Sequence, residues 1–169
     1  MALPEFSLVD LYAAIDAQRH ARGLTWSAAM SEISGPFVSG RSRPLALSTV
    51  KGLRTKPVAE GDGVLQLLRW LGRTPESFVA GIEFDARAAL PVVGPGDVLR
   101  FDTRRLHAAL NTTRAARGLT WQQIASDVDM SAASLTHLSK GGRTGFPHVV
   151  RLARWLGAPT SHFIRITSR

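Results

Sequence analysis

The pentapeptide Arg-Gly-Leu-Thr-Trp occurs twice in the chain, at residues 22–26 and again at residues 117–121. Five identical residues that include the rare tryptophan are improbable by chance in a chain of 169 residues. Self-similarity of this kind indicates one small structural unit that the chain builds twice. The repeat therefore constrains the fold to two related copies, each with a modest apolar core.

Alignment by hand extends the repeat over most of the chain. At the same offset of 95 residues, Leu11 matches Leu106. Beyond the pentapeptide the offset falls to 85, and Arg-Trp-Leu-Gly at residues 69–72 recurs at residues 154–157. The first copy therefore carries ten extra residues, and we expect an inserted loop in the Gly-, Pro-, Ser- and Arg-rich stretch 34–44.

Helix-end signals divide the second copy into five successive helical segments. Asp102, Thr120 and Ser131 each precede apolar residues with helical spacing and stand where an N-cap is expected. Gln123 follows Thr120 by three residues and completes a capping box. Gly118 occupies the usual place of a left-handed glycine after a helix. We therefore expect an all-α fold of two tandem five-helix units.

The expected organisation is a first domain at residues 1–83, a linker at residues 84–100 and a second domain at residues 101–169. The linker holds two prolines and two glycines. Its apolar residues indicate a segment that packs down or forms a short strand, and not a loose tether.

Positive charge gathers in the second copy. The chain has a formal net charge of +8, with 10 basic and 9 acidic residues at 1–95 but 11 basic and 4 acidic residues at 96–169. Such a segment attracts polyanions. Arginine outnumbers lysine 18 to 3, which favours bidentate contact with phosphate or guanine, although high-GC coding gives the same bias.

Several classes of protein are excluded by what the sequence lacks. Without cysteine there are no disulfides or thiolate metal sites, and no two histidines are three or four residues apart, so no metal site or cofactor is expected. No apolar run approaches the roughly 18 residues of a membrane span, and no basic, apolar leader is visible. No catalytic constellation stands out. We therefore expect a cytoplasmic protein that is not an enzyme.

Residues 120–141, with the sequence TWQQIASDVDMSAASLTHLSKG, resemble the helix-turn-helix of the lambda-repressor-like (Cro, XRE) DNA-binding family. Ala125 falls where the two helices cross and only a small side chain fits. The hydrophobic Met130 follows the turn and precedes Ser131, and Leu135 is an inward position of the second helix of the motif.

The resemblance covers residues 101–166 directly and residues 6–82 only through the internal repeat. It implies two tandem five-helix lambda-repressor-like helix-turn-helix domains, of which the first copy is diverged. It further implies a repressor-like regulator of transcription that reads double-stranded DNA at the nucleoid. The chain departs from the family at Trp121, where glutamine is usual.

The resemblance also implies which residues of the second copy meet DNA. A recognition helix in the major groove presents its N-terminal and outward residues to base edges; these are Ser131, Ala132, Ala133, Ser134, Thr136 and His137. The expected phosphate contacts are Thr120, Gln122, Gln123, Lys140, Arg143 and Thr144. The base-facing set contains no arginine or glutamine for bidentate base reading, so we expect modest sequence discrimination.

The first copy offers a second set of candidates. Its outward and basic positions are Arg41, Arg43, Ser48, Thr49, Lys51, Arg54 and Lys56. The two arginines of the inserted loop could follow the DNA backbone or enter a minor groove, or the loop could be disordered. The four tryptophans recur within the apolar pattern, so we expect core packing for Trp26, Trp70, Trp121 and Trp155.

Three functions stay open at this stage. In the first, the chain is one regulator whose two copies each read one half-site of the DNA, and it acts as a monomer or a weak homodimer. In the second, the first copy is a protein-interaction or dimerisation module and only the second copy binds DNA. In the third, the chain is a weakly specific architectural or phage-type DNA-binding protein.

Overall fold

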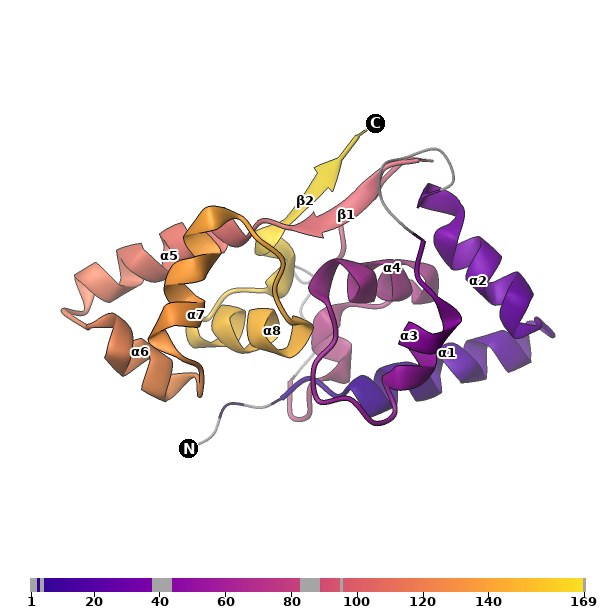
Figure 1. Cartoon of the computed structure of the whole chain (residues 1–169), viewed down its shortest axis with the longest axis horizontal. Helices are drawn as coiled ribbons and strands as arrows, with labels where there is room; N and C mark the ends of the chain where they lie inside the picture. The colour runs from indigo at the N-terminus through magenta and orange to yellow at the C-terminus, as the bar shows by residue number, and fades with distance from the viewer. Residues whose placement is uncertain (1–2, 4, 38–43, 83–88, 95, 169) are drawn as a thin grey trace.

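The computed structural model describes residues 3, 5–37, 44–82, 89–94 and 96–168 (Figure 1). In the first half the helices are α1 (Leu8–Ala21), α2 (Trp26–Ser34), α3 (Leu47–Gly52) and α4 (Gly61–Leu71). In the second half they are α5 (Thr103–Ala116), α6 (Trp121–Asp127), α7 (Ala132–His137) and α8 (Phe146–Trp155). The strands are β1 (Val98–Phe101) and β2 (Ile164–Thr167).

The expected all-α fold of two tandem five-helix lambda-repressor-like domains is wrong. β1 and β2 form an antiparallel pair, with Val98 opposite Thr167, and branched residues such as these and Ile166 favour extended backbone. The expected fifth helix is one 3₁₀ turn in each half, at Pro75–Phe78 and at Thr160–Phe163. Each half of the described chain therefore has four α-helices and a short turn, and the whole adds a two-stranded sheet.

The predicted helix ends of the second half are confirmed. The side chains of Asp102, Thr120 and Ser131 each accept a backbone N–H in the first turn of the next helix. Gln123 completes the capping box at the start of α6. Gly118 has a φ of +63°, a conformation that a side chain would strain.

Equivalent hydrogen bonds show that the duplication extends to three dimensions. In the first half the N–H of Ser7 donates to the carbonyl of Phe78 at 2.9 Å. In the second half the N–H of Asp102 donates to the carbonyl of Phe163 at 2.7 Å. Each bond ties the start of the first helix of a half to the 3₁₀ turn at the end of that half.

The repeated pentapeptide builds the same corner in both halves. Arg22 lies over the Trp70 ring, and the indole N–H of Trp70 donates to Glu32 at 2.9 Å. The equivalent contacts of the second half join Arg117, Trp155 and Asp127. The four tryptophans are partly buried and pack against the edge of the core. The arginine-covered rings therefore fasten the fourth helix of each half to the preceding helices.

The two halves meet along a seam formed by residues 59–61 and 144–146. Glu60 and Gly145, which are equivalent in the repeat, form an antiparallel bridge. On its two sides the N–H of Gly61 donates to Thr144 at 2.9 Å, and the N–H of Phe146 donates to Ala59 at 2.8 Å.

The seam has local pseudo-two-fold symmetry. At the offset of 85 residues, Gly61 corresponds to Phe146 and Ala59 corresponds to Thr144. Each of the two flanking hydrogen bonds is therefore the symmetry copy of the other. The halves face one another as the subunits of an isologous dimer do, but within one chain.

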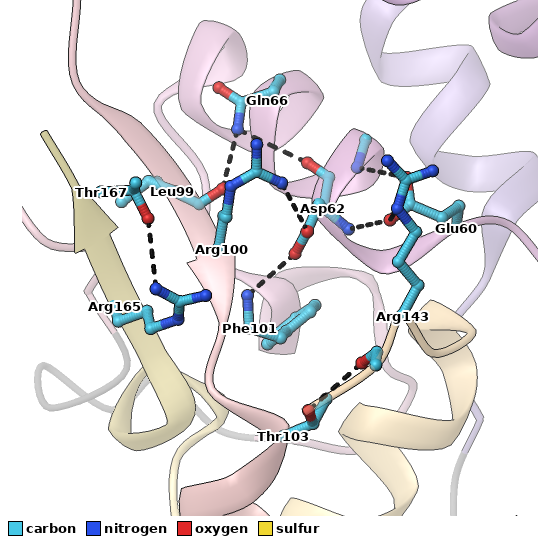
Figure 2. Close-up of polar contacts among 12 residues, drawn as sticks. Glu60, Asp62, Gln66, Leu99, Arg100, Phe101, Thr103, Arg143, Arg165 and Thr167 are labelled. Carbon is cyan, nitrogen blue, oxygen red and sulfur yellow. Dashed lines mark hydrogen bonds and ion pairs between the residues drawn. The ribbon is translucent and has the colours of Figure 1, made fainter. Parts of the chain in front are cut away.

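Apolar packing and α4 reinforce the seam. The ring of Phe146 is fully buried, and its centroid lies 4.5 Å from that of Phe6 and 5.4 Å from that of Phe101. Figure 2 shows α4 bound to β1: Asp62 accepts the N–H of Phe101 at 2.9 Å, and the Gln66 amide donates to a β1 carbonyl at 3.0 Å. One apolar cluster thus runs through both halves.

None of the helices in the described part of the chain is both long and apolar enough to cross a membrane.

The seam predicts that Gly61→Ala destabilises the fold. A Cβ at Gly61 would lie 2.8 Å from a ring carbon of Phe101 and 3.0 Å from the carbonyl oxygen of Thr144. The clash should exceed the gain in helix propensity of up to about 1 kcal/mol and lower the free energy of unfolding by about 1–3 kcal/mol. Urea denaturation measures the change.

Gly52→Ala is the matched control, because Gly52 ends α3 and an added Cβ there meets only the end of the flexible Lys56 side chain, at 3.4 Å. It should leave stability unchanged or raise it by less than about 1 kcal/mol. Equal stability of the two variants would show that the seam is looser than described.

Candidate nucleic-acid interface

The helices α6 and α7 form a pair joined by a tight turn. α6 ends at Asp127, and Asp129 in the turn has a φ of +50°. The N–H of Met130 donates to the carbonyl of Ala125 at 3.0 Å, which closes the turn onto α6. Ser131 then caps α7 by accepting a backbone N–H at 3.1 Å.

Small and apolar residues hold the two helices together. Ala125 on α6 is 1% exposed, and Leu135 on α7 is fully buried. Ile124 and Val128 are fully buried beside them. Because a larger side chain at Ala125 would force the helices apart, the packing fixes the angle at which α7 is presented.

Arg151 of α8 holds the turn through hydrogen bonds to its backbone. Its side chain is 12% exposed. One guanidinium nitrogen donates to the carbonyls of Val128 and Asp129, at 2.8 and 3.2 Å. The other terminal nitrogen forms an ion pair with Glu5. Hydrogen bonds from a charged donor are stronger than neutral ones, so Arg151 positions the whole helix pair relative to α8.

The expected base-facing residues gather on the outer side of α7. Five of them are exposed: Ser131, Ala133, Ser134, Thr136 and His137. Ala132 departs from the set, because it is half-buried and packs against the core. The exposed side chains are small, apart from His137, so a ligand can approach the helix backbone closely.

Three of the hydroxyl groups on this face form hydrogen bonds within the segment itself. The hydroxyls of Ser131 and Ser134 are 2.7 Å apart and share a hydrogen bond. The Thr136 hydroxyl donates to the carbonyl of Ala133 at 3.0 Å. A hydroxyl that donates locally still has lone pairs to accept from a ligand. The face therefore offers acceptors and methyl groups more readily than strong donors.

A hollow of about 430 Å³ lies between α7, the loop after it and α8. Ala133, Ser134 and His137 line one side of it, and Arg143 and His148 line the other. The hollow continues the exposed face of α7 toward the seam.

The expected phosphate contacts fall into two groups. Thr120 and Gln123 bond to one another in the capping box, so their polar atoms are partly used, while Gln122 is exposed on the first turn of α6. Lys140 and Arg143 are exposed beyond α7.

Arg143 reaches out from the seam. Its side chain is 78% exposed, and its Nε lies 4.0 Å from a carboxylate oxygen of Glu60 (Figure 2). Thr144 next to it is half-buried and uses its carbonyl in the seam. Arg143 is therefore held only weakly and keeps most of its charge accessible.

The structure brings two further arginines to this side, which the sequence did not suggest. Arg100 on β1 and Arg165 on β2 line a second hollow of about 220 Å³ together with Arg143 and Asp62. Arg100 forms an ion pair with Asp62 at 3.0 Å, whereas Arg165 is exposed and donates weakly to Thr167 at 3.5 Å (Figure 2). No local signal marks them, because the pairing of two distant strands places them there.

In the first half the corresponding face belongs to α3. The candidates Ser48, Thr49, Lys51, Arg54 and Lys56 are all exposed there. Arg41 and Arg43 lie outside the described residues.

α3 is held differently from α7. It has no contact with α2 as extensive as that between α6 and α7. It is anchored through Val50 and Leu53, which are 0% and 2% exposed. Arg54 lies over the Tyr12 ring, 5.2 Å from its centroid. The core therefore positions α3 without the tight turn of the second half.

Comparison of the chain with protein-family models, with curated proteins and with solved structures gave no match.

His148 predicts how stability changes with pH. Partial burial, and next the positive charge of Arg151, lower the pKa of His148 below its ordinary value. The unfolded chain therefore takes up this proton at a higher pH than the folded chain does. The contribution of His148 to stability is complete above the ordinary imidazole pKa of about 6.5 and is lost as the pH falls below it.

We expect His148→Gln to lose less stability than the wild type between about pH 7.5 and about pH 5.5. Urea denaturation at both pH values measures the difference. His162→Gln, at an exposed position, is the control substitution. The same pH dependence in all three proteins would contradict the assignment.

Proposed function

We propose that the chain is a DNA-binding regulator of transcription, repressor-like and without catalysis, which places α7 in the major groove of double-stranded DNA. The proposal rests on the pair of α6 and α7, whose turn is held by Arg151. The outer face of this pair carries small side chains and is flanked by Lys140 and Arg143. A protein with this role works in the cytoplasm, at the nucleoid.

The shape of the face suits a groove. An α-helix enters the major groove with its outward side chains against base edges. The exposed side chains of Ala133, Ser134 and Thr136 are short, so the helix backbone can approach the bases closely. Alanine and threonine methyls suit the thymine methyl group, and hydroxyls suit several base edges.

The charge of the second half supports the same partner. Lys140 and Arg143 follow α7 directly and are exposed, where they can meet the phosphates that border the groove. Arg165 adds a third accessible cation on β2. Phosphate contacts of this kind supply most of the sequence-independent affinity for DNA.

Selection of duplexes from a random pool by the full chain tests the proposal. We expect one sequence to be enriched, and His137→Ala to relax the choice at one position by about 0.5–1.5 kcal/mol, as for the loss of a single hydrogen bond. An enriched pool without a common sequence would favour weakly specific architectural binding instead. No retained duplex at all would overturn the proposal.

The salt dependence of binding tests the two flanking cations. Replacing Lys140 and Arg143 together by alanine should weaken all duplexes about equally, because phosphate contacts carry no sequence information. The slope of log K against log salt should fall by about two, roughly 0.9 for each lost contact. Fluorescence anisotropy at several salt concentrations measures this slope.

Arg73→Gln is the matched charge control. Arg73 is exposed beyond the end of α4 that points away from the seam, and it stacks on Phe78. Its removal should leave the slope unchanged. An unchanged slope in the double variant would remove Lys140 and Arg143 from the interface.

A further inference from the structure

The seam makes α3 and α7 counterparts of one another. A rotation about a two-fold axis leaves the height of each element along that axis unchanged. Elements that the pseudo-axis exchanges therefore face the same side of the molecule. Figure 1 shows this for α3 and α7, which lie on the near side of the molecule, one on each side of the centre where α4 and α8 meet.

The exposed positions of the two helices also correspond. At the offset of 85 residues, Ser48 matches Ala133 and Thr49 matches Ser134, and all four are exposed. All four side chains are small, and Thr49 and Ser134 both carry a hydroxyl, whereas Ser48 carries one and Ala133 does not. The two helices therefore present faces of similar shape and unlike hydrogen-bonding pattern.

Positive charge borders both helices. Lys51 and Lys56 are exposed on and after α3. Lys140 and Arg143 are exposed after α7. Each half thus has a helix face with short side chains and, next to it, exposed cationic side chains. In both halves these features lie on the same side of the molecule.

We infer that one chain reads one DNA duplex with both halves, as two unlike half-sites in inverted orientation. The inference rests on the proposed function and adds to it the symmetry of the DNA partner. A duplex has two-fold axes perpendicular to its length, and operator symmetry mirrors protein symmetry. Halves related by rotation read inverted half-sites, whereas halves related by translation would read direct repeats.

The spacing of the half-sites is fixed by the seam. Two backbone hydrogen bonds, the buried Phe146 ring and the lack of room at Gly61 leave little freedom between the halves. Half-sites read on one face of a duplex lie a whole number of helical turns apart, roughly 34 Å per turn, and the rigid seam should tolerate little change in their separation.

Footprinting and stoichiometry on the selected duplex test the inference with the full chain. We expect one chain per duplex by analytical ultracentrifugation, with an imperfect inverted repeat protected over both halves. Altering one base pair of either half should weaken binding by about tenfold. Inserting roughly five base pairs between the halves turns one half-site to the opposite face and should weaken binding by at least as much.

A matched pair of variants assigns each half-site to its helix. Lys51→Ala with Lys56→Ala should lose protection over one half, and Lys140→Ala with Arg143→Ala should lose it over the other. Circular dichroism confirms that both variants fold, since all four residues are exposed.

The outcomes separate the inference from the proposed function. A direct repeat, a single protected half-site or two chains per duplex would overturn the inference and leave DNA binding in place. Binding that is insensitive to the inserted base pairs would also overturn it. Absence of any retained duplex would overturn the proposed function, and the inference with it.

Discussion

The rest of the structure depends on two mutually equivalent backbone hydrogen bonds, from Gly61 to Thr144 and from Phe146 to Ala59. They bind the start of α4 to the start of α8, the two most deeply buried helices of the halves. Backbone groups buried in such a place must be paired, and here each half supplies the partner of the other. The orientation of α3 relative to α7 follows from this one contact.

The two copies have kept the contacts of the arginine–tryptophan corner and have changed other positions. Arg22 over Trp70 and Arg117 over Trp155 form the same corner, each closed by a carboxylate on the second helix. One position inside the fourth helix differs: Arg151 of α8, which holds the turn between α6 and α7, stands where α4 has Gln66, which binds β1. One scaffold therefore carries two different surfaces.

Local sequence signals predicted the helix ends correctly. They did not predict the contacts that join residues distant in the sequence. The capping box of Thr120 and the left-handed Gly118 depend on neighbours within four residues, so both could be read from the sequence. β1 and β2 have four residues each and pair across the whole second half, and so short a pattern does not predict its partner. The clamp of Arg151 on a turn 22 residues away is equally invisible in the sequence.

The seam compensates for the limited base recognition that the small side chains of α7 allow. With no arginine or glutamine among Ala133, Ser134 and Thr136, a single half lacks the bidentate contacts that discriminate bases most strongly. Because the two halves are joined rigidly, binding of the second half becomes intramolecular once the first half is bound. The high effective concentration of the second half then raises the overall affinity without any new contact. On the proposed function, the fixed geometry of the seam supplies the specificity that each helix face lacks, because only a duplex with both half-sites at the right separation and direction satisfies both halves.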